Sequence, residues 1–340
     1  MPEPGRMFWK SLLTARRPEG EELLLRRGRR LGIDRSHGDP RLVAARAAAE
    51  RGADGWPEVR GPLAAAQDAD DLGFLVEGLA GVPGLERWIG GVAEADGADP
   101  LPRLLCAARR VERAGRGRWG TGVAAPDGLS GPAVAELEAA EAELREVARL
   151  RPSGAVLTTA HHLVQVCGQG LGVDAGTARE RFEAVVGSAP GHLAAHRTYL
   201  RQLAGAPEGS AERVLAFARR AAGAEPAGGP LGELVALARL AEWAGLGRDP
   251  EGPSLRRPEA VAELRHAAER SVLHPDFVRR RDWALTANTF ALACALAGDH
   301  VCARRLFRML GDRVTEMPWL LLDERSPAVP FTAFRARVTV

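Results

Sequence analysis

Alanine and leucine dominate the apolar residues of this chain, while isoleucine is almost absent. The 340 residues include 61 Ala and 42 Leu, but isoleucine occurs only at Ile33 and Ile89. Ala and Leu favour α-helices, whereas β-branched residues favour sheets. The sequence therefore predicts an all-α protein, with a length that suits two domains or one elongated array of helices.

Charge and hydropathy narrow the possible classes of protein further. The chain carries 46 basic and 44 acidic side chains, a formal net charge of +2, and 46% hydrophobic residues. This hydrophobic fraction excludes wholesale disorder, and the balanced charge argues against a dedicated nucleic-acid binder. Lys10 is the only lysine among many arginines, which is typical of a GC-rich bacterial genome.

The sequence also predicts where the protein resides. No stretch reaches the roughly 18 apolar residues of a membrane span, and residues 1–20 lack the apolar segment of an export signal. Cys106, Cys167, Cys294 and Cys302 form no Cys-x-x-Cys motif, which favours free thiols in a reducing compartment. We therefore expect a cytoplasmic protein without a membrane segment. Cys294 and Cys302 flank a predicted turn between helices and are the two thiols able to approach each other.

Breaks in the helical pattern divide the chain into four regions. Residues 1–114 form an N-terminal helical region, with helices expected near 8–30 and 39–51, another that begins near Trp56, and others near 68–80, 84–95 and 100–114. Residues 115–131 are rich in Gly, Arg and Pro, show no periodicity, and are the best candidate for a boundary. Residues 132–316 contain regular helices, and residues 317–340 form a tail that the apolar run Trp319–Leu322 would anchor.

The helices of the third region come in pairs. A long helix over 132–150 is followed by pairs whose members are 12–18 residues long and end at Gly, Pro or Asp. The expected pairs are 155–170 with 174–188, 191–204 with 210–223, 230–244 with 257–272, and 281–297 with 299–311. Helix pairs at intervals of about 35–45 residues are typical of α-solenoids.

Two segments have the residue spacing of a helical repeat. One contains the series Ala178, Phe182 and Pro190, and the other contains the series Gly298, Asp299, Ala303 and Phe307. The small Ala lets neighbouring helices approach, and the Phe four residues later fills the space between successive pairs. Gly adopts the backbone conformation that the tight turn requires, and Pro begins the next helix.

These spacings resemble the tetratricopeptide-repeat superfamily, and more loosely the multi-helix bacterial proteins with degenerate repeats of unassigned function. The resemblance covers about residues 150–312. It implies a right-handed α–α superhelix, a solenoid of helix pairs, and a compact helical bundle is the alternative architecture. The aromatic–Leu-Gly–Tyr series expected on the first helix of each repeat is missing from both segments.

The resemblance also implies a recognition surface, because the first helix of each tetratricopeptide pair lines the concave side. On the helix after Pro190, the residues that would face this groove are His192, His196, Tyr199 and Gln202. On the last pair the equivalent residues are Leu285, Asn288, Thr289 and Leu292. Tyr199 is the only tyrosine of the chain, and amphipathic aromatic residues are favoured as binding anchors. The alternative is that these side chains cover a packed neighbour, with Tyr199 in the core.

Other motifs have a structural explanation that we prefer. The segment from Cys167 to Gly172 resembles a dinucleotide-binding loop only in its glycines, and the end of a helix followed by a Gly-rich turn explains it better. His192 and His196 are one helical turn apart, a spacing that suits metal chelation, but no third ligand is evident. Asp68, Asp70 and Asp71 stand where a helix N-cap is expected.

Two basic clusters are candidate nucleic-acid sites, namely residues 26–30 and residues 113–119, where Arg118 precedes Trp119. Arginine beside an aromatic ring can bind single strands by charge and stacking. We prefer a solvated helix end for the first cluster and a surface loop for the second. No combination of nucleophile, base and acid can be assembled from the sequence.

The sequence therefore favours a non-enzymatic helical-repeat scaffold that binds a protein or peptide partner through a concave groove. No cofactor or metal is expected, and nucleic acid is a less favoured partner. The alternative from a different class is a helical enzyme or small-molecule-binding accessory protein with a pocket between the two halves of the chain.

Overall fold

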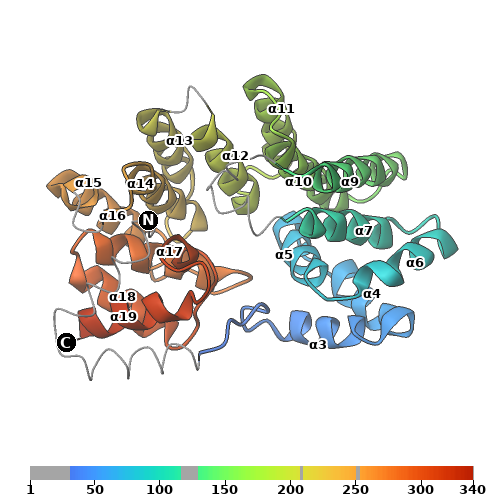
Figure 1. The fold of residues 1–340 in the computed structure, drawn as a ribbon, viewed down its shortest axis with the longest axis horizontal. Helices are drawn as coiled ribbons and strands as arrows, with labels where there is room; N and C mark the ends of the chain where they lie inside the picture. The colour runs from blue at the N-terminus through green and yellow to red at the C-terminus, as the bar shows by residue number, and fades with distance from the viewer. Residues whose placement is uncertain (1–30, 116–128, 207–209, 250–252, 340) are drawn as a thin grey trace. The chain divides into compact units, whose positions relative to one another are not determined.

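The computed structural model describes residues 31–115, 129–206, 210–249 and 253–339. Within these residues the chain forms sixteen α-helices, a few short 3-10 turns and no β-strand (Figure 1). The helices pack in consecutive pairs. The expectation of an all-α protein is therefore confirmed.

The described residues form two compact units. Residues 38–209 make up the first, which we call the α3–α12 unit. Residues 210–340 make up most of the second, the α13–α19 unit, to which residues 31–37 also belong. Arg35 makes an ion pair with Glu316 within this unit, with 2.9 Å between Nη2 and Oε1. The second unit is therefore discontinuous in sequence.

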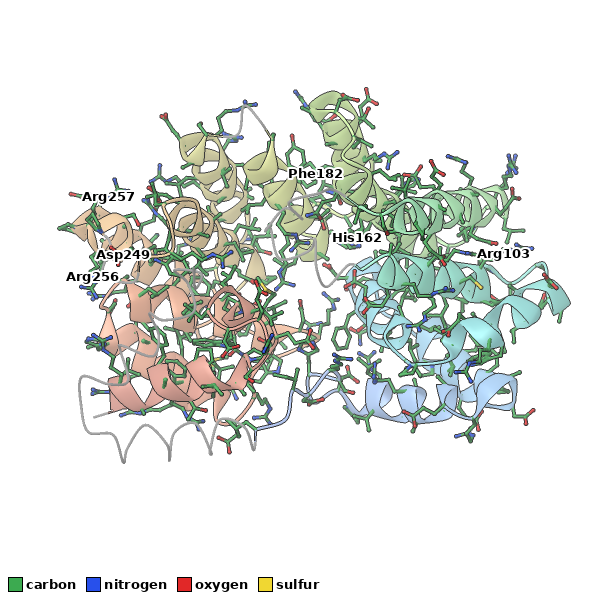
Figure 2. The ribbon with its side chains drawn as sticks, viewed as in Figure 1. Arg103, His162, Phe182, Asp249, Arg256 and Arg257 are labelled. Carbon is green, nitrogen blue, oxygen red and sulfur yellow. The ribbon has the colours of Figure 1, made fainter. Side chains whose placement is uncertain are left out.

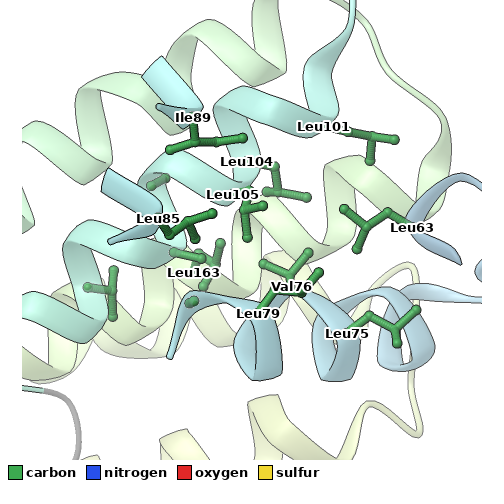
Figure 3. Close-up of a cluster of buried hydrophobic side chains, with 14 of the residues drawn as sticks. Leu63, Leu75, Val76, Leu79, Leu85, Ile89, Leu101, Leu104, Leu105 and Leu163 are labelled. Atoms are coloured by element: carbon green, nitrogen blue, oxygen red, sulfur yellow. The ribbon is translucent and has the colours of Figure 1, made fainter. Parts of the chain in front are cut away.

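The α3–α12 unit holds nine helices. Their bounds are α3 Pro40–Ala49, α4 Trp56–Ala64, α5 Ala69–Ala80, α6 Ile89–Ala95, α7 Pro100–Arg113, α9 Gly131–Arg149, α10 Gly154–Leu171, α11 Ala175–Val186 and α12 Leu193–Gly205. α10 packs against α5, α7, α9, α11 and α12. Buried leucines from α5 and α7, including Leu79 and Leu104, surround Leu163 of α10 in the core (Figure 3).

The structure divides the chain at a different place from the predicted boundary at 115–131. α7 and α9 lie on either side of that segment, yet they pack directly on each other. Leu104 and Leu137 belong to the same hydrophobic core, and Arg110 of α7 makes an ion pair with Glu136 of α9. A Gly-rich and Pro-rich segment thus connects two helices that share one core. The compact units meet in sequence near residue 209, between the two members of the predicted pair 191–204 and 210–223.

The α13–α19 unit is built around one buried helix. Its helices are α13 Ala211–Ala224, α14 Glu233–Gly245, α15 Pro253–Arg256, α16 Pro258–Arg270, α17 Trp283–Leu296, α18 His300–Leu310 and α19 Ala328–Thr339. Every residue of α17 except Leu285 is buried, because α14, α15, α16, α18 and α19 all pack against it. Phe307, Trp319 and Phe331 form an aromatic cluster beside it.

Two parts of this unit were not foreseen. Residues 245–257, between the expected helices 230–244 and 257–272, contain the short helix α15. The tail 317–340 ends in α19, whose Pro330 lies in the first helical turn, where proline is tolerated. The prolines of the tail were interpreted as helix breaks, and α19 was therefore not predicted. Trp319, the expected anchor of the tail, is completely buried.

Aspartates begin several helices, as the sequence indicates. The side chains of Asp39, Asp68 and Asp99 accept hydrogen bonds from backbone N–H groups in the first turns of α3, α5 and α7. These carboxylates satisfy N–H groups that have no partner inside the helix. Asp68 therefore has a structural role, in agreement with the preferred interpretation.

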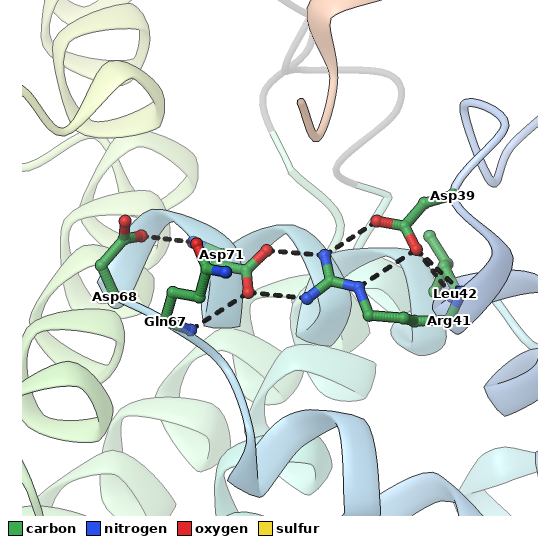
Figure 4. A network of polar contacts seen from close by, with 6 residues as sticks. All are labelled: Asp39, Arg41, Leu42, Gln67, Asp68 and Asp71. Carbon is green, nitrogen blue, oxygen red and sulfur yellow. Dashed lines mark hydrogen bonds and ion pairs between the residues drawn. The ribbon is translucent and has the colours of Figure 1, made fainter. Parts of the chain in front are cut away.

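Arg41 joins the beginnings of α3 and α5 (Figure 4). Its two terminal nitrogens each lie 2.8 Å from one oxygen of Asp71, and Nη2 also lies 2.8 Å from Asp39. Burial alone would raise the pKa of Asp39, but hydrogen bonds from Arg41 outweigh it and hold that pKa below its usual value. Asp71 is buried, so most of its polar contacts are made with the protein.

We expect Asp71→Asn to lower the unfolding free energy by about 1–2 kcal/mol. The amide of asparagine has only one oxygen that can accept from the guanidinium group of Arg41. Its NH2 group would then face the second guanidinium N–H, which is also a donor. Urea unfolding followed by circular dichroism measures the loss. Asp54→Asn, at an exposed position of the same unit, is the matched control and should change stability by less than about 0.5 kcal/mol. Equal effects of the two substitutions would contradict the role given to Arg41.

The two cysteines that flank the turn between α17 and α18 do meet. The sulfur atoms of Cys294 and Cys302 are 3.1 Å apart, and both thiols are free and buried. The hydrogen bond between the thiols, together with burial, holds the pKa of Cys294 well above its ordinary value. The pair therefore belongs to the packing between α17 and α18.

Several predictions fall on residues outside the described part of the chain. They include the helix over 8–30, the basic cluster 26–30, and most of the segment 115–131 with Arg118 and Trp119. Among the helices of the described residues, none is long and apolar enough to cross a bilayer.

Candidate functional site

The helix predicted to line the groove begins later than expected. Pro190 lies in a turn, and α12 starts at Leu193. His192 is the N-cap: its Nδ1 accepts a hydrogen bond from the backbone N–H of Ala195 at 3.2 Å. The imidazole is buried in this position. The expectation that Pro190 begins the helix and His192 faces an open groove is therefore wrong, because the ring turns back to cap the helix.

The other predicted residues of α12 are packed to different degrees. His196 is buried, whereas Tyr199 and Gln202 are half-buried. Phe182 of α11 stacks on Tyr199, with ring centroids 4.5 Å apart and an interplanar angle of 6°. The same phenylalanine meets His196 edge-on at 5.1 Å. These contacts favour the alternative in which the side chains cover a packed neighbour.

Asn288 is also buried, in the α13–α19 unit. Its Nδ2 donates to the backbone oxygen of Arg313 at 3.0 Å, and its Oδ1 accepts from Trp319 Nε1 at 2.7 Å. Thr289 is buried as well and donates to Glu233 of α14. The expectation that Asn288 and Thr289 face a groove is wrong, because α14 and the tail segment cover that side of α17.

The repeat positions occupy tight contacts. Ala178 and Ala303 are buried, and Phe182 and Phe307 are only 9% and 2% exposed. Phe182 lies between α11 and α12, which belong to successive pairs. Gly298 has a φ of +78° in the turn before α18, and Asp299 caps that helix by accepting from Cys302 N–H. These side chains lie at packed or capping positions, and their assignment to a helical repeat stays a prediction.

The structure brings a third histidine, His162, to His192 and His196, which lie one helical turn apart in sequence. We call His162 of α10, His192 and His196 the histidine cluster; Figure 2 labels His162 together with Phe182. The rings of His162 and His192 have centroids 5.0 Å apart. Asp70 Oδ1 lies 3.3 Å from His192 Nδ1, and Glu77 Oε1 lies 3.7 Å from His162 Nδ1. Both carboxylates come from α5, so the cluster joins α5, α10 and α12.

His192 has two competing neighbours at the same nitrogen. When Nδ1 accepts from Ala195 N–H, the proton of the neutral ring is on Nε2. A proton on Nδ1 would face Asp70 instead, but it would remove the acceptor for Ala195. His196 Nδ1 lies 2.9 Å from the backbone oxygen of His192, so the two rings are linked through that carbonyl group. The arrangement fixes the start of α12 against α5.

The cluster has the side chains of acid–base chemistry but is closed to solvent. His162 and His192 are both buried, so a substrate has no access to their ring nitrogens. In the described part of the chain, no group of three or more His, Cys, Asp or Glu side chains is placed to hold a metal ion. The cluster thus acts as a polar core that ties three helices together. Sequence reasoning missed Asp70, Glu77 and His162, because only the packing of α5 on α10 brings them together.

Stability should depend on pH through His196. Burial lowers the pKa of His196, and the neighbouring His192 lowers it further, against the opposing effect of the hydrogen bond to the His192 carbonyl. The unfolded chain therefore binds a proton at His196 more readily than the folded chain. We expect the unfolding free energy to be highest above pH 6.5 and to fall as the pH drops through that value towards the lower pKa of the folded state.

Urea unfolding at several pH values between 5 and 8 tests this dependence. His196→Phe keeps an aromatic ring against Phe182 and removes the titrating group, so the slope of stability against pH should decrease. Thr198→Val, on the same helix, removes no titrating group and serves as the control. An unchanged slope in His196→Phe would show that other groups cause the pH dependence.

The α3–α12 unit also has a surface cleft of about 340 Å³. It is lined by residues from 60–72, 98–101 and 150–156, which come from both the predicted N-terminal region and the predicted repeat region. Its charged groups are Arg60 and Asp99, whose Nε and Oδ2 atoms lie 2.7 Å apart. Asp99 also caps α7. The two charges of the cleft are therefore already engaged with the protein.

The glycine-rich segment after Cys167 is the end of a helix. α10 continues through Leu171, and Gly172 adopts a left-handed conformation with φ of +66° at its C-cap. The backbone N–H of Val173 then donates to the carbonyl oxygen of Gly168. The preferred interpretation, a helix end with a glycine turn, is confirmed.

Comparison with known proteins gives no relative: no family model matches the chain, and no curated protein or solved structure is significantly similar to it. The resemblance to tetratricopeptide repeats consequently depends on the spacing and packing of this chain's own residues.

Proposed function

We propose that the protein is a non-enzymatic helical-repeat scaffold that binds a protein or peptide partner. In this proposal its helix pairs form a tetratricopeptide-like right-handed array, a finer statement than the all-α architecture alone. Such arrays present long continuous surfaces, which suit extended partners.

One observation supports the proposal most directly: within each unit, the first helix of one predicted pair packs on the first helix of the next, α10 on α12 and α14 on α17. α10 packs on both α11 and α12, and α11 packs on α12. In the other unit α14 packs on α16 and α17, and α17 packs on α18 and α19. Contact between successive helix pairs is the packing on which helical solenoids are built, and α10 also packs on the earlier helices α5 and α7. The buried Ala and Phe at the repeat positions support the same arrangement.

The partner surface in this proposal excludes the buried side chains of the predicted groove. His192, His196 and Asn288 serve the packing of α12 and α17, whereas Tyr199 and Gln202 retain partial exposure. A partner would therefore contact the outer parts of α12 and the exposed loops between helix pairs.

Affinity capture with the full chain as bait tests the proposed function. We expect a defined protein to be retained from the source organism, to be identified by cross-linking mass spectrometry, and to form a stable complex with the purified chain. The matched control bait is an unrelated helical-repeat protein of similar size and charge. Failure to retain any protein beyond those held by the control would overturn the proposal.

The cleft beside Arg60 favours a second candidate, a small-molecule-binding accessory protein. Its volume lies at the lower end of the range for ligand sites, about 300–1,000 Å³. Native mass spectrometry of the purified chain would then detect a bound small molecule, and Arg60→Ala would reduce its occupancy. A spectrum of the unliganded chain alone contradicts this alternative.

A further inference from the structure

Arginines surround one tryptophan at the start of α17. We call Arg279, Arg280, Trp283 and Arg313 the arginine–tryptophan surface. The guanidinium carbons of Arg279 and Arg313 lie 5.1 Å and 5.9 Å from the centroid of the Trp283 ring. Arg279 and Arg280 are exposed, and they lie in the segment that connects α16 to α17. Two guanidinium groups are thus held over a single indole, and the exposed Arg280 is the neighbour of one of them in sequence.

Among the described residues, no Asp or Glu makes an ion pair with Arg279, Arg280 or Arg313. The acidic residues closest to Arg313 in sequence have other partners: Asp312 pairs with Arg335, and Glu316 pairs with Arg35. Like charges held close together repel one another, and an anionic partner relieves that repulsion. The surface therefore has a specific complement, a group of negative charges.

The surface is held in place before any partner binds. The backbone N–H of Trp283 donates to the backbone carbonyl oxygen of Arg280 at 3.1 Å. The backbone N–H of Arg280 donates to the backbone carbonyl oxygen of Val278 at 2.9 Å. Asn288 fixes the backbone of Arg313, and Trp319 fixes Asn288 in turn. The two cation–π contacts restrict the guanidinium groups themselves. A surface that is already ordered loses less conformational entropy on binding.

An apolar side chain lies beside the cations. Val278 is 54% exposed, directly before Arg279, and its neighbour Phe277 is half-buried. The surface thus offers apolar contact next to positive charge. Trp283 is only 9% exposed, so its ring is not open to stacking by a nucleobase, which single-stranded nucleic acids require of aromatic platforms. This combination suits an acidic peptide with apolar residues better than a nucleic acid.

We propose that the arginine–tryptophan surface docks an acidic, partly apolar segment of another protein. Carboxylates of the segment pair with Arg279, Arg280 and Arg313, and an apolar side chain covers Val278. The inference rests on the proposed function, since it names the chemistry of the partner that the scaffold binds.

Fluorescence anisotropy with the full chain tests the docking. The probe is a fluorescein-labelled peptide of 14 residues in which Glu and Asp alternate with Leu. We expect saturable binding that weakens as salt rises, because the contacts are between exposed charges. The double substitution Arg279→Glu and Arg280→Glu should weaken binding by about tenfold or more. The neutral version, with alanine at both positions, should weaken it less.

A matched control separates a specific surface from general positive charge. Arg220→Glu combined with Arg256→Glu makes the same change in net charge at exposed positions of the same unit. This control should bind the peptide within about twofold of the unaltered chain, because charges outside the arginine–tryptophan surface act mainly through the screened long-range field. Thermal unfolding by circular dichroism verifies that all variants fold.

Three results would overturn the inference: no binding of the peptide, equal weakening by the control pair, or tighter binding of a labelled 14-nucleotide single strand than of the peptide.

Affinity capture then distinguishes the two proposals. If the Arg279→Glu/Arg280→Glu chain retains the same protein partner as the unaltered chain, the docking surface is wrong and the scaffold function stands. If neither chain retains a protein, the scaffold function fails as well.

Discussion

Replacing Trp319 by alanine is expected to lower the unfolding free energy of the α13–α19 unit by about 3–5 kcal/mol. The indole is completely buried, and its ring centroid lies 5.4 Å from that of Phe331 and 6.1 Å from that of Phe307. Its Nε1 also donates to Asn288. The substitution therefore leaves a large cavity and removes the donor to a buried amide oxygen.

Two further variants separate these causes. Trp319→Phe keeps an aromatic ring and loses the hydrogen bond, so a smaller loss of about 1–3 kcal/mol is expected. Arg337→Ala, at an exposed position of α19, should cost less than about 0.5 kcal/mol. Urea unfolding followed by circular dichroism provides all three values. A loss below 1 kcal/mol for Trp319→Ala would mean that the aromatic cluster does not stabilise the unit.

Phe182→Ala should have a comparable effect in the α3–α12 unit, about 3–5 kcal/mol. The ring fills the space between α11 and α12 by stacking on Tyr199 and meeting His196 edge-on. Ala178 and Phe182 are the Ala and Phe of the repeat spacing in this region. The decrease in unfolding free energy therefore measures how much Phe182 contributes to the packing between successive helix pairs.

The matched control for this position is Phe182→Leu, which keeps most of the volume. It should cost about 1.5 kcal/mol or less, the range of hydrophobic substitutions of similar size. The same urea experiment compares the two variants. If Phe182→Ala and Phe182→Leu lose equal stability, packing volume is not the cause, and the explanation from the repeat spacing is wrong at this position.

Local sequence signals predicted the helices well. The aspartate caps before α3, α5 and α7 stand at the expected places, because a carboxylate one position before a helix has a direct interaction with the first backbone N–H groups. The helix pair α17 and α18 was likewise marked by Gly298 and Asp299 in its turn. Such interactions span three or four residues, so they can be recognised without knowledge of the fold.

Contacts between distant segments could not be predicted in this way. His162 and Asp70 are brought into the same cluster by the packing of α5 on α10, and nothing in their local sequence indicates it. The exposure of His192 was misjudged because its ring caps a helix, a role more common for Asp or Ser. The sequence does contain a signal for the arginine–tryptophan surface, because three consecutive arginines are separated from Trp283 by one residue. The basic clusters identified from the sequence were only those at 26–30 and 113–119.

The discontinuity of the α13–α19 unit sets an order of events while the chain is being made on the ribosome. All residues of the α3–α12 unit have been synthesised once Gly209 is added, so that unit can close its core early. Arg35 has by then been translated, but its partner Glu316 has not. At a synthesis rate of about 20 residues per second, the N-terminal segment waits roughly five seconds or more for its own unit. If translation stopped after the α3–α12 unit, the released chain would contain that folded unit and an N-terminal segment. The α13–α19 residues with which this segment packs would not have been synthesised.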